Sequence, residues 1–157
     1  MHLSAQEEYG LRCLVQVARR GHSGPVGIAE VADAEGLSSD YTAKLLRVLR
    51  QGELLNSTRG AAGGYVLARP AAEISVWQAI EILGGPLFSE SLCDSHAGLK
   101  TDCVHTGGCS MRSMWTWLGG AVKDALSGIS LADLLNTETA MSQRLELVSL
   151  RGARAHS

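Results

Sequence analysis

The order of elements in the first half of the chain constrains its fold more than any other feature of the sequence. Two short helical stretches, at 26–35 and 39–51, are separated by Gly36. Two strand-like stretches, at 54–58 and 64–68, then flank the segment RGAAGG, whose glycines permit the backbone angles of a hairpin tip. Helix, turn, helix and hairpin follow one another in a winged helix-turn-helix, so the sequence predicts that fold.

Apolar residues at helical spacing predict further helices on both sides of this unit. They are expected at 4–20, 75–83, 110–126 and 130–136. The first begins with Ser4, and Glu7 follows three residues later, which is the pattern of a capping box. The last residues, 137–157, show no clear amphipathic pattern and are predicted to form a flexible tail. The predicted fold class is mainly α with a small β-hairpin wing.

The helix at 39–51 and the hairpin carry the side chains expected to contact DNA. Short polar residues at the start of this helix let its N-terminus approach base edges and phosphates. Basic residues follow at spacings of three, and an arginine at the hairpin tip could enter a minor groove. The expected DNA-contacting residues are Ser38, Ser39, Asp40, Tyr41, Thr42, Lys44, Arg47, Arg59 and Gly60.

The distribution of charge supports this hypothesis. Residues 38–70 hold five basic and two acidic side chains, a net charge of +3, whereas the whole chain carries −2 and the remainder therefore −5. The alternative is an ordinary solvated surface on a structural three-helix unit. Arg59 favours DNA binding, because a purely structural turn has no need of an arginine there.

Three of the four cysteines lie close together, with the spacing C-x9-C-x5-C at Cys93, Cys103 and Cys109. Structural zinc sites usually contain ligands paired two to four residues apart, which this spacing lacks. The polar N-terminus, without a secretory signal or membrane span, predicts a cytoplasmic chain, where disulfides are rare. A glycine-containing loop of thiolates suits an iron–sulfur cluster. Unligated cysteines, or a thiol redox switch without metal, remain the alternative.

Taken together, these features resemble one family. The opening MHLSAQEEYGLRCL, the block GLSSDYTAKLLRVLRQGELLNSTRGAAGGYVLARP and the three-cysteine loop before a long helix are similar to the iron–sulfur winged-helix regulators that include IscR, NsrR and RirA. The resemblance covers residues 1–136. It implies a homodimer that binds double-stranded operator DNA and carries a [2Fe–2S] or [4Fe–4S] cluster. The implied parts are a DNA-binding domain at 1–84, a cluster-binding loop at 85–109, a dimerisation helix with a short following helix at 110–136, and the tail at 137–157.

The resemblance also bears on the fourth cluster ligand. Members similar to IscR use a histidine three residues after the third cysteine, where this chain has Arg112, which does not ligate iron. Members similar to NsrR take a carboxylate from the first helix of the partner, and Glu8 occupies that place here. His96 and His105 are rival ligands within the loop. Cys13 is expected to be a buried residue of the first helix.

The helix at 110–126 carries an apolar stripe that the implied dimer would bury, with an intramolecular core as the alternative. The stripe consists of Met111, Met114, Trp115, Leu118, Val122, Ala125 and Leu126.

The sequence argues against enzymatic function and leaves three kinds of non-enzymatic function open. It contains no nucleophile elbow, phosphate-binding loop or pattern of paired catalytic carboxylates, so we expect neither an enzyme nor a small-molecule substrate. The leading hypothesis is a DNA-binding regulator that senses redox state, nitric oxide or iron status through its cluster. A metal-free thiol-switch regulator and a cluster-carrying protein for electron transfer or cluster delivery are the alternatives.

Overall fold

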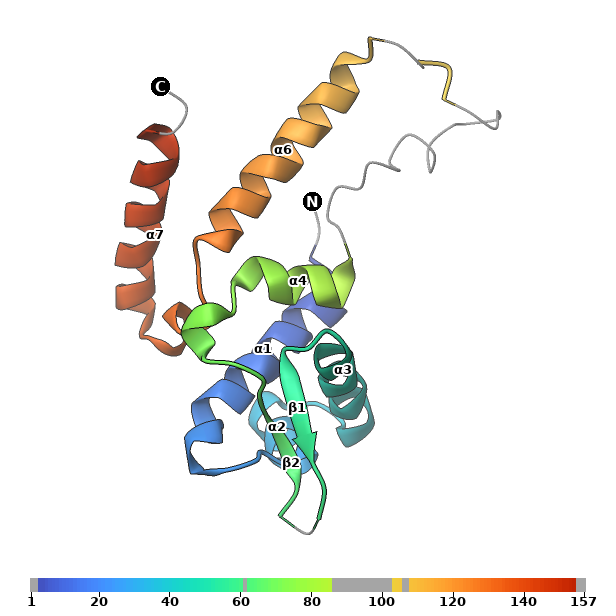
Figure 1. Ribbon diagram of the computed structural model, residues 1–157, viewed down its shortest axis with the longest axis vertical. Coiled ribbons are helices and arrows are strands. Elements are labelled where there is room, and N and C mark those ends of the chain that lie inside the picture. The colour runs from blue at the N-terminus through green and yellow to red at the C-terminus, as the bar shows by residue number, and fades with distance from the viewer. Residues whose placement is uncertain (1–2, 61, 86–102, 106–107, 155–157) are drawn as a thin grey trace.

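The computed structural model describes residues 3–60, 62–85, 103–105 and 108–154. An N-terminal body contains α1 to α4 and a β-hairpin, and two further helices, α6 and α7, extend from one end of that body (Figure 1). The hairpin tip lies at the opposite end of the molecule (Figure 1).

The helical part of the body follows the sequence prediction closely. It contains α1 (Ala5–Arg20), α2 (Ile28–Glu35) and α3 (Ser39–Gln51). The capping box at the start of α1 is confirmed: Glu7 N donates to Ser4 Oγ at 3.2 Å, and Ser4 N donates to Glu7 Oε2 at 2.7 Å. Gly36 ends α2 with a φ of +65°, a conformation that glycine adopts without the strain of a Cβ.

The hairpin consists of β1 (Leu55–Thr58) and β2 (Gly64–Leu67), paired antiparallel. Val26, in the turn between α1 and α2, adds a bridge to the outer edge of β2. The Val26 and Tyr65 backbones exchange two N–H to O hydrogen bonds, each of 2.9 Å. Gly64 permits this close approach, because a Cβ there would lie 2.5 Å from Val26 O. The hairpin is therefore fastened to the helical body at this bridge.

The main core lies between α1, α3 and α4 (Val76–Gly84). Its largest fully buried side chains include Leu14, Leu45, Leu46, Leu49, Leu54, Leu55, Ile74, Leu83 and Leu131. Burying each such side chain contributes about 1.5–3 kcal/mol. The crossing of α1 and α4 is close, since a Cβ on Gly10 would collide with the side chain of Leu83. This core holds α3 and the hairpin in fixed positions.

The chain approaches the body along α6 (Ser110–Ser127) and is fixed to it just after this helix. Val76 N donates to Ile129 O at 2.9 Å, and Leu131 N donates to Ile74 O at 2.7 Å. Ile129 and Leu131 are both buried. The predicted helix at 130–136 is only one turn of 3-10 helix, η3 (Asp133–Leu135).

The structure differs from the predicted flexible tail at 137–157, because α7 (Glu138–Arg154) occupies most of that segment. Met141 and Val148 of α7 pack against a small cluster formed by Val76, Ile80 and Ile129. Tertiary contacts of this kind stabilise a helix whose own amphipathic pattern is weak. In the described part of the chain, no helix is long and apolar enough to cross a membrane.

Candidate nucleic-acid interface and cysteine region

The start of α3 presents polar side chains to solvent. Ser38 is the N-cap, and its Oγ accepts a hydrogen bond from Tyr41 N at 3.3 Å. Ser38, Ser39 and Asp40 are exposed, as are Lys44 and Arg47 farther along the helix. Backbone N–H groups at a helix N-terminus attract anions, so this end of α3 is suited to approach a phosphate backbone.

Thr42 corrects the predicted set of DNA contacts. Its side chain is 0% exposed, and its Oγ1 has no hydrogen-bond partner among the described residues. It faces the core on the same side of α3 as the buried Leu45 and Leu49. Tyr41 is half-buried, with its ring edge-on to that of Tyr9 at a centroid distance of 6.2 Å. Thr42 therefore helps to seat α3 on the body and does not reach its surface.

The hairpin tip is a tight turn that carries an exposed arginine. Gly64 N donates to Thr58 Oγ1 at 3.2 Å, and Gly63 N donates to Gly60 O at 2.9 Å. Gly60 has a φ of +113°, which side-chain-bearing residues rarely adopt. Arg59 is exposed beside it. The turn thus projects a cation beyond the end of the body.

Arg69 contributes to the basic charge of this region but has a structural role that the sequence did not indicate. Its guanidinium donates to Glu53 O and Glu73 O, each at 3.4 Å, and to Gln78 Oε1 at 3.3 Å. These contacts connect the end of the hairpin to the start of α4. Arg69 keeps its positive charge, because these acceptors are neutral, but its guanidinium is held against the body.

Of the three clustered cysteines, Cys93 lies outside the described residues, as does His96. Cys103 and Cys109 are half-buried and form no disulfide, and His105 is exposed. Cys109 is the N-cap residue of α6. Among the described residues, which do not include Cys93, no three His, Cys, Asp or Glu side chains come together as a metal site.

Glu8 is exposed on the first turns of α1, next to the buried Glu7 of the capping box. The Gln6 side-chain amide donates to Leu83 O and so ties the start of α1 to the end of α4. The N-terminal end of α1 and the end of α4 lie together in Figure 1. Glu8 is therefore near the point at which the chain leaves α4 towards the cysteines.

Cys13 is buried, as the sequence predicts. Burial, supported by the nearby negative charge of Glu35, raises the pKa of its thiol to about 12. The thiol stays protonated at neutral pH. Cys13 is thus part of the core and is poorly suited to bind a metal.

The apolar stripe of α6 is only partly covered within one chain. Met111 is 56% exposed and Trp115 is 38% exposed, whereas Leu126 packs against the body. Trp117, which lies outside the predicted stripe, is 64% exposed. Contacts within one chain thus cover apolar side chains at the end of α6 near the body, whereas those at the end near Cys109 stay exposed.

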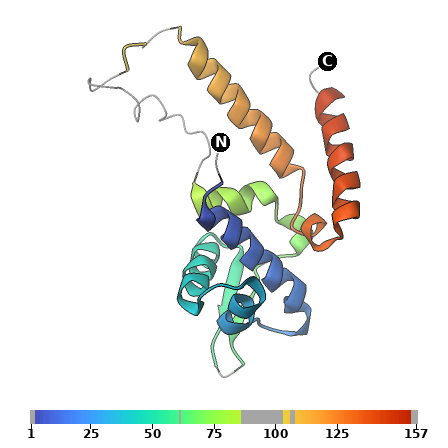
Figure 2. The same cartoon turned by 180° about the vertical axis from the view of Figure 1, so that it is seen from behind.

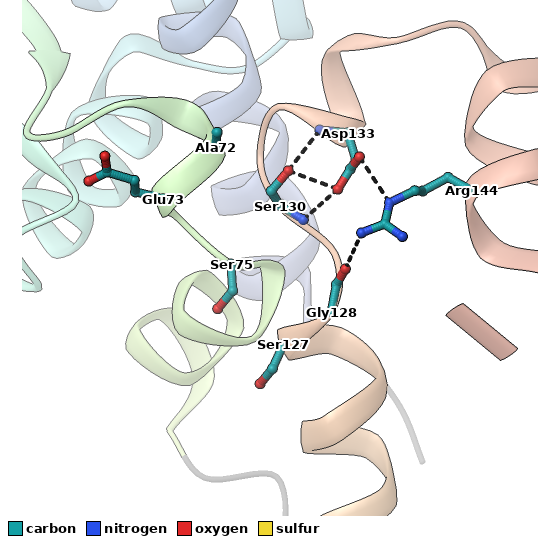
Figure 3. A pocket seen from close by; sticks show the side chains of 8 residues that line it. All are labelled: Ala72, Glu73, Ser75, Ser127, Gly128, Ser130, Asp133 and Arg144. Atoms are coloured by element: carbon teal, nitrogen blue, oxygen red, sulfur yellow. Dashed lines mark hydrogen bonds and ion pairs between the residues drawn. The ribbon is translucent and has the colours of Figure 1, made fainter. Parts of the chain in front are cut away.

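A polar hollow of about 390 Å³ lies where α6, η3 and α7 meet (Figure 3). It is lined by Ala72, Glu73, Ser75, Ser127, Gly128, Ser130, Asp133 and Arg144. Arg144 Nε contacts Asp133 Oδ1 at 3.2 Å, and Arg144 Nη2 donates to Gly128 O at 2.8 Å. Ser130 N and Oγ each donate to Asp133 Oδ2 at 2.8 Å. The contacts of Arg144 with Asp133 and with Gly128 O therefore connect α7 to the end of α6.

The balance of interactions lowers the pKa of Asp133. Partial burial acts in the opposite direction, but the hydrogen bonds from Ser130 and the charge of Arg144 outweigh it. The carboxylate is consequently ionised at neutral pH, as its contacts to Arg144 require.

Comparison with known proteins agrees with this fold and identifies a family. The model of the Rrf2 family, described as an iron-dependent transcriptional regulator, matches residues 3–137. The chain is 35% identical to protein rrf2 of Nitratidesulfovibrio vulgaris over 138 residues, which cover 86% of this chain and 87% of that protein. It is 30% identical to the transcriptional regulator IscR of Erwinia tasmaniensis, over 88% of this chain and 81% of that one.

Solved structures show the same architecture. CymR, the global cysteine regulator of Bacillus subtilis, has a TM-score of 0.69 at 28% identity, over 86% of this chain and 96% of its own. IscR of T. potens has a TM-score of 0.67 at 30% identity, over 86% of each chain. The prediction of a mainly helical winged helix-turn-helix is confirmed, and so is the expectation that the chain is not an enzyme. The chain belongs to the Rrf2 family of DNA-binding transcriptional regulators.

Proposed function

We propose that this Rrf2-family regulator is a homodimer that binds operator DNA with α3 and the hairpin and senses redox state, nitric oxide or iron status through an iron–sulfur cluster. The observation that carries the DNA-binding part is the pairing of an exposed, polar helix start at Ser38–Asp40 with Arg59 on a closed hairpin tip. Two such units in a dimer would read two half-sites of a pseudo-palindromic operator.

The donor set of the chain fits an iron–sulfur cluster. Cys103 and Cys109 are partly accessible thiols outside any disulfide, and Cys93 supplies a third in the sequence. Thiolates are the usual ligands of such clusters, and a carboxylate can complete the set. Glu8 of the partner subunit is the proposed fourth ligand, because it is exposed and does not take part in the capping box. When bound, the cluster supplies an iron centre that reacts with oxidants or nitric oxide.

The dimer is proposed to form along α6. The exposed apolar side chains of this helix lie towards its Cys109 end and include Met111, Met114, Trp115 and Trp117. Burying apolar surface contributes about 25 cal/mol of free energy for each Å² removed from water. Contiguous exposed apolar side chains often mark interfaces with another protein chain. A dimer along α6 would bring the cysteine region of one chain near the other chain.

A regulator that works by thiol oxidation without metal is the second candidate. The structural likeness to CymR of Staphylococcus aureus, including its oxidized form at a TM-score of 0.66, favours it. Cys103 and Cys109 would then be the reactive groups. A protein for electron transfer or cluster delivery shares the cysteines but requires neither Arg59 nor the polar start of α3.

Anaerobic purification followed by an absorption spectrum and iron and sulfide analysis tests the cluster. We expect a coloured protein containing iron and sulfide, whose colour is lost when Cys93, Cys103 and Cys109 are replaced by Ala. A colourless protein without iron would overturn the cluster in favour of the thiol switch. Replacing Glu8 by Ala should alter the spectrum and leave the fold intact.

A mobility shift with duplexes selected from a random-sequence pool tests DNA binding in the same preparation. Selection of a two-fold symmetric site is the expected result. Failure to select any duplex at moderate salt would favour the electron-transfer or delivery protein. Unchanged operator affinity in the triple cysteine variant would contradict the coupling of the cluster to DNA binding.

A further inference from the structure

We propose that the C-terminal end of α1 forms a third contact with the DNA backbone, beside the hairpin, through Arg19 and Arg20. This inference rests on the proposed function, because it extends the surface with which the chain would hold an operator. It assigns the two arginines to phosphates, so they would contribute affinity without selecting a base sequence.

The local sequence concentrates positive charge at the C-terminal end of α1. Between Glu8 and Glu30 there is no acidic residue, and the three charged side chains in between are Arg12, Arg19 and Arg20. Arg12 is used internally, because its Nε lies 2.6 Å from Glu35 Oε2. The two remaining arginines thus give the end of α1 its charge.

Arg19 and Arg20 are exposed, and no carboxylate neutralises them in the described part of the chain. The ion pairs there are Arg12–Glu35 and Arg144–Asp133. Arg20 Nε donates a long hydrogen bond of 3.4 Å to the neutral side chain of Gln16. Both guanidinium groups therefore keep their charge available to an external anion.

The end of α1 that carries them is fixed next to the hairpin by the turn that follows it. His22 Nδ1 lies 2.8 Å from Arg19 O, so the ring closes the end of α1 in the 3-10 turn η1 (Gly21–Ser23). η1 contacts β2, and Val26 pairs with Tyr65 through two backbone hydrogen bonds. The arginines are thus attached to the same rigid unit as Arg59.

The positions of α3, the hairpin and the end of α1 suit a contact that extends along the DNA duplex. Figures 1 and 2 show the hairpin between α3 on one side and the turn after α1 on the other. When α3 lies in a major groove and Arg59 enters the adjacent minor groove, the next surface along the duplex is a phosphate backbone. The basic end of α1 lies beyond the hairpin on that side of the protein, so it would face this backbone.

Salt dependence provides the main test. Each phosphate contact adds about 0.9 to the negative slope of log affinity against log salt concentration. A dimer that loses two arginines per chain loses up to four contacts, so the slope of Arg19→Gln/Arg20→Gln should fall by up to about 3.6. We would measure it by fluorescence anisotropy, using a duplex selected by the unaltered protein, at KCl concentrations of about 50–300 mM.

Control variants separate phosphate contact from stability. Arg19→Lys/Arg20→Lys should keep most of the slope, because lysine retains the charge. Lys123→Gln removes an exposed charge on α6, away from this surface, and should leave the slope unchanged. If the arginines served only to complement the helix dipole of α1, the glutamine variant would lower the melting temperature and leave the slope as it was.

Hydroxyl-radical footprinting locates the contact. Arg19→Gln/Arg20→Gln should lose protection of the backbone next to the stretch whose protection depends on Arg59, with the same preferred sequence. A slope and footprint equal to those of the unaltered protein would overturn this inference and leave the proposed function in place. If the unaltered protein selects no duplex, the proposed function itself fails.

Discussion

Replacing Gly64 by Ala should loosen the hairpin from the body and lower the free energy of unfolding by about 1–6 kcal/mol. A Cβ at this position would lie 2.5 Å from Val26 O and 2.7 Å from Val26 C, both of them backbone atoms that cannot rotate away. The strand must therefore shift and give up the two 2.9 Å hydrogen bonds between Val26 and Tyr65.

The magnitude follows from three contributions. Two lost hydrogen bonds cost about 0.5–1.5 kcal/mol each. Steric crowding in a packed region costs about 1–3 kcal/mol. The reduced freedom of the unfolded chain offsets about 0.4–1 kcal/mol of that total.

Urea denaturation followed by circular dichroism measures the change as a shift of midpoint at constant m-value. Gly21→Ala is the matched control, because a Cβ there has no atom within 4 Å and its φ of −64° suits alanine. That variant should be neutral or slightly more stable. If the two variants differed by less than about 0.5 kcal/mol, the contact between Gly64 and Val26 would not stabilise the hairpin as argued.

Three further substitutions test separate parts of the molecule. Arg59→Ala should weaken operator binding by about 1–3 kcal/mol, and an unchanged mobility shift would exclude its role. Thr42→Val should leave DNA binding unaltered. It should keep or raise the melting temperature, because it removes a buried hydroxyl that has no partner in the described structure. A large loss of affinity for the operator would instead place Thr42 at the DNA interface. Asp133→Asn should destabilise the protein at pH 7. The pKa of Asp133 is lowered in the folded state, so its contribution to stability is fully present above the unfolded pKa of about 3.9. That contribution is lost as the pH falls through the folded-state pKa. The difference in urea midpoint between variant and parent should therefore shrink below about pH 4.

Local signals explain why most of the N-terminal body was predictable. Ser4 with Glu7, Gly36 between two helices and the glycines around Arg59 each act within a few residues, and the structure contains the cap, the break and the hairpin tip where the sequence places them. Patterns of this kind depend little on distant parts of the chain.

The errors involve contacts between distant segments. α7 depends on packing against Val76 and Ile80, which lie about 60 residues earlier in the sequence. The sequence does not indicate the structural role of Arg69, because its partners Glu53 and Gln78 meet only in the folded chain. Thr42 could have been placed correctly, since residues 42, 45 and 49 share the helical spacing of a buried face.

The attachment of α6 to the body gives the helix a mechanical property. Its far end, at Cys109, is some 27 Å from the junction near Gly128, at a rise of about 1.5 Å for each of its 18 residues. The near end is held by the burial of Ile129 and Leu131 and by the hydrogen bond from Arg144 to Gly128 O. A stiff rod held in this way behaves as a lever, in which a displacement of about 2 Å at Cys109 tilts the rod by about 4°. That tilt acts directly on Ile129, whose carbonyl accepts the hydrogen bond from the first residue of α4.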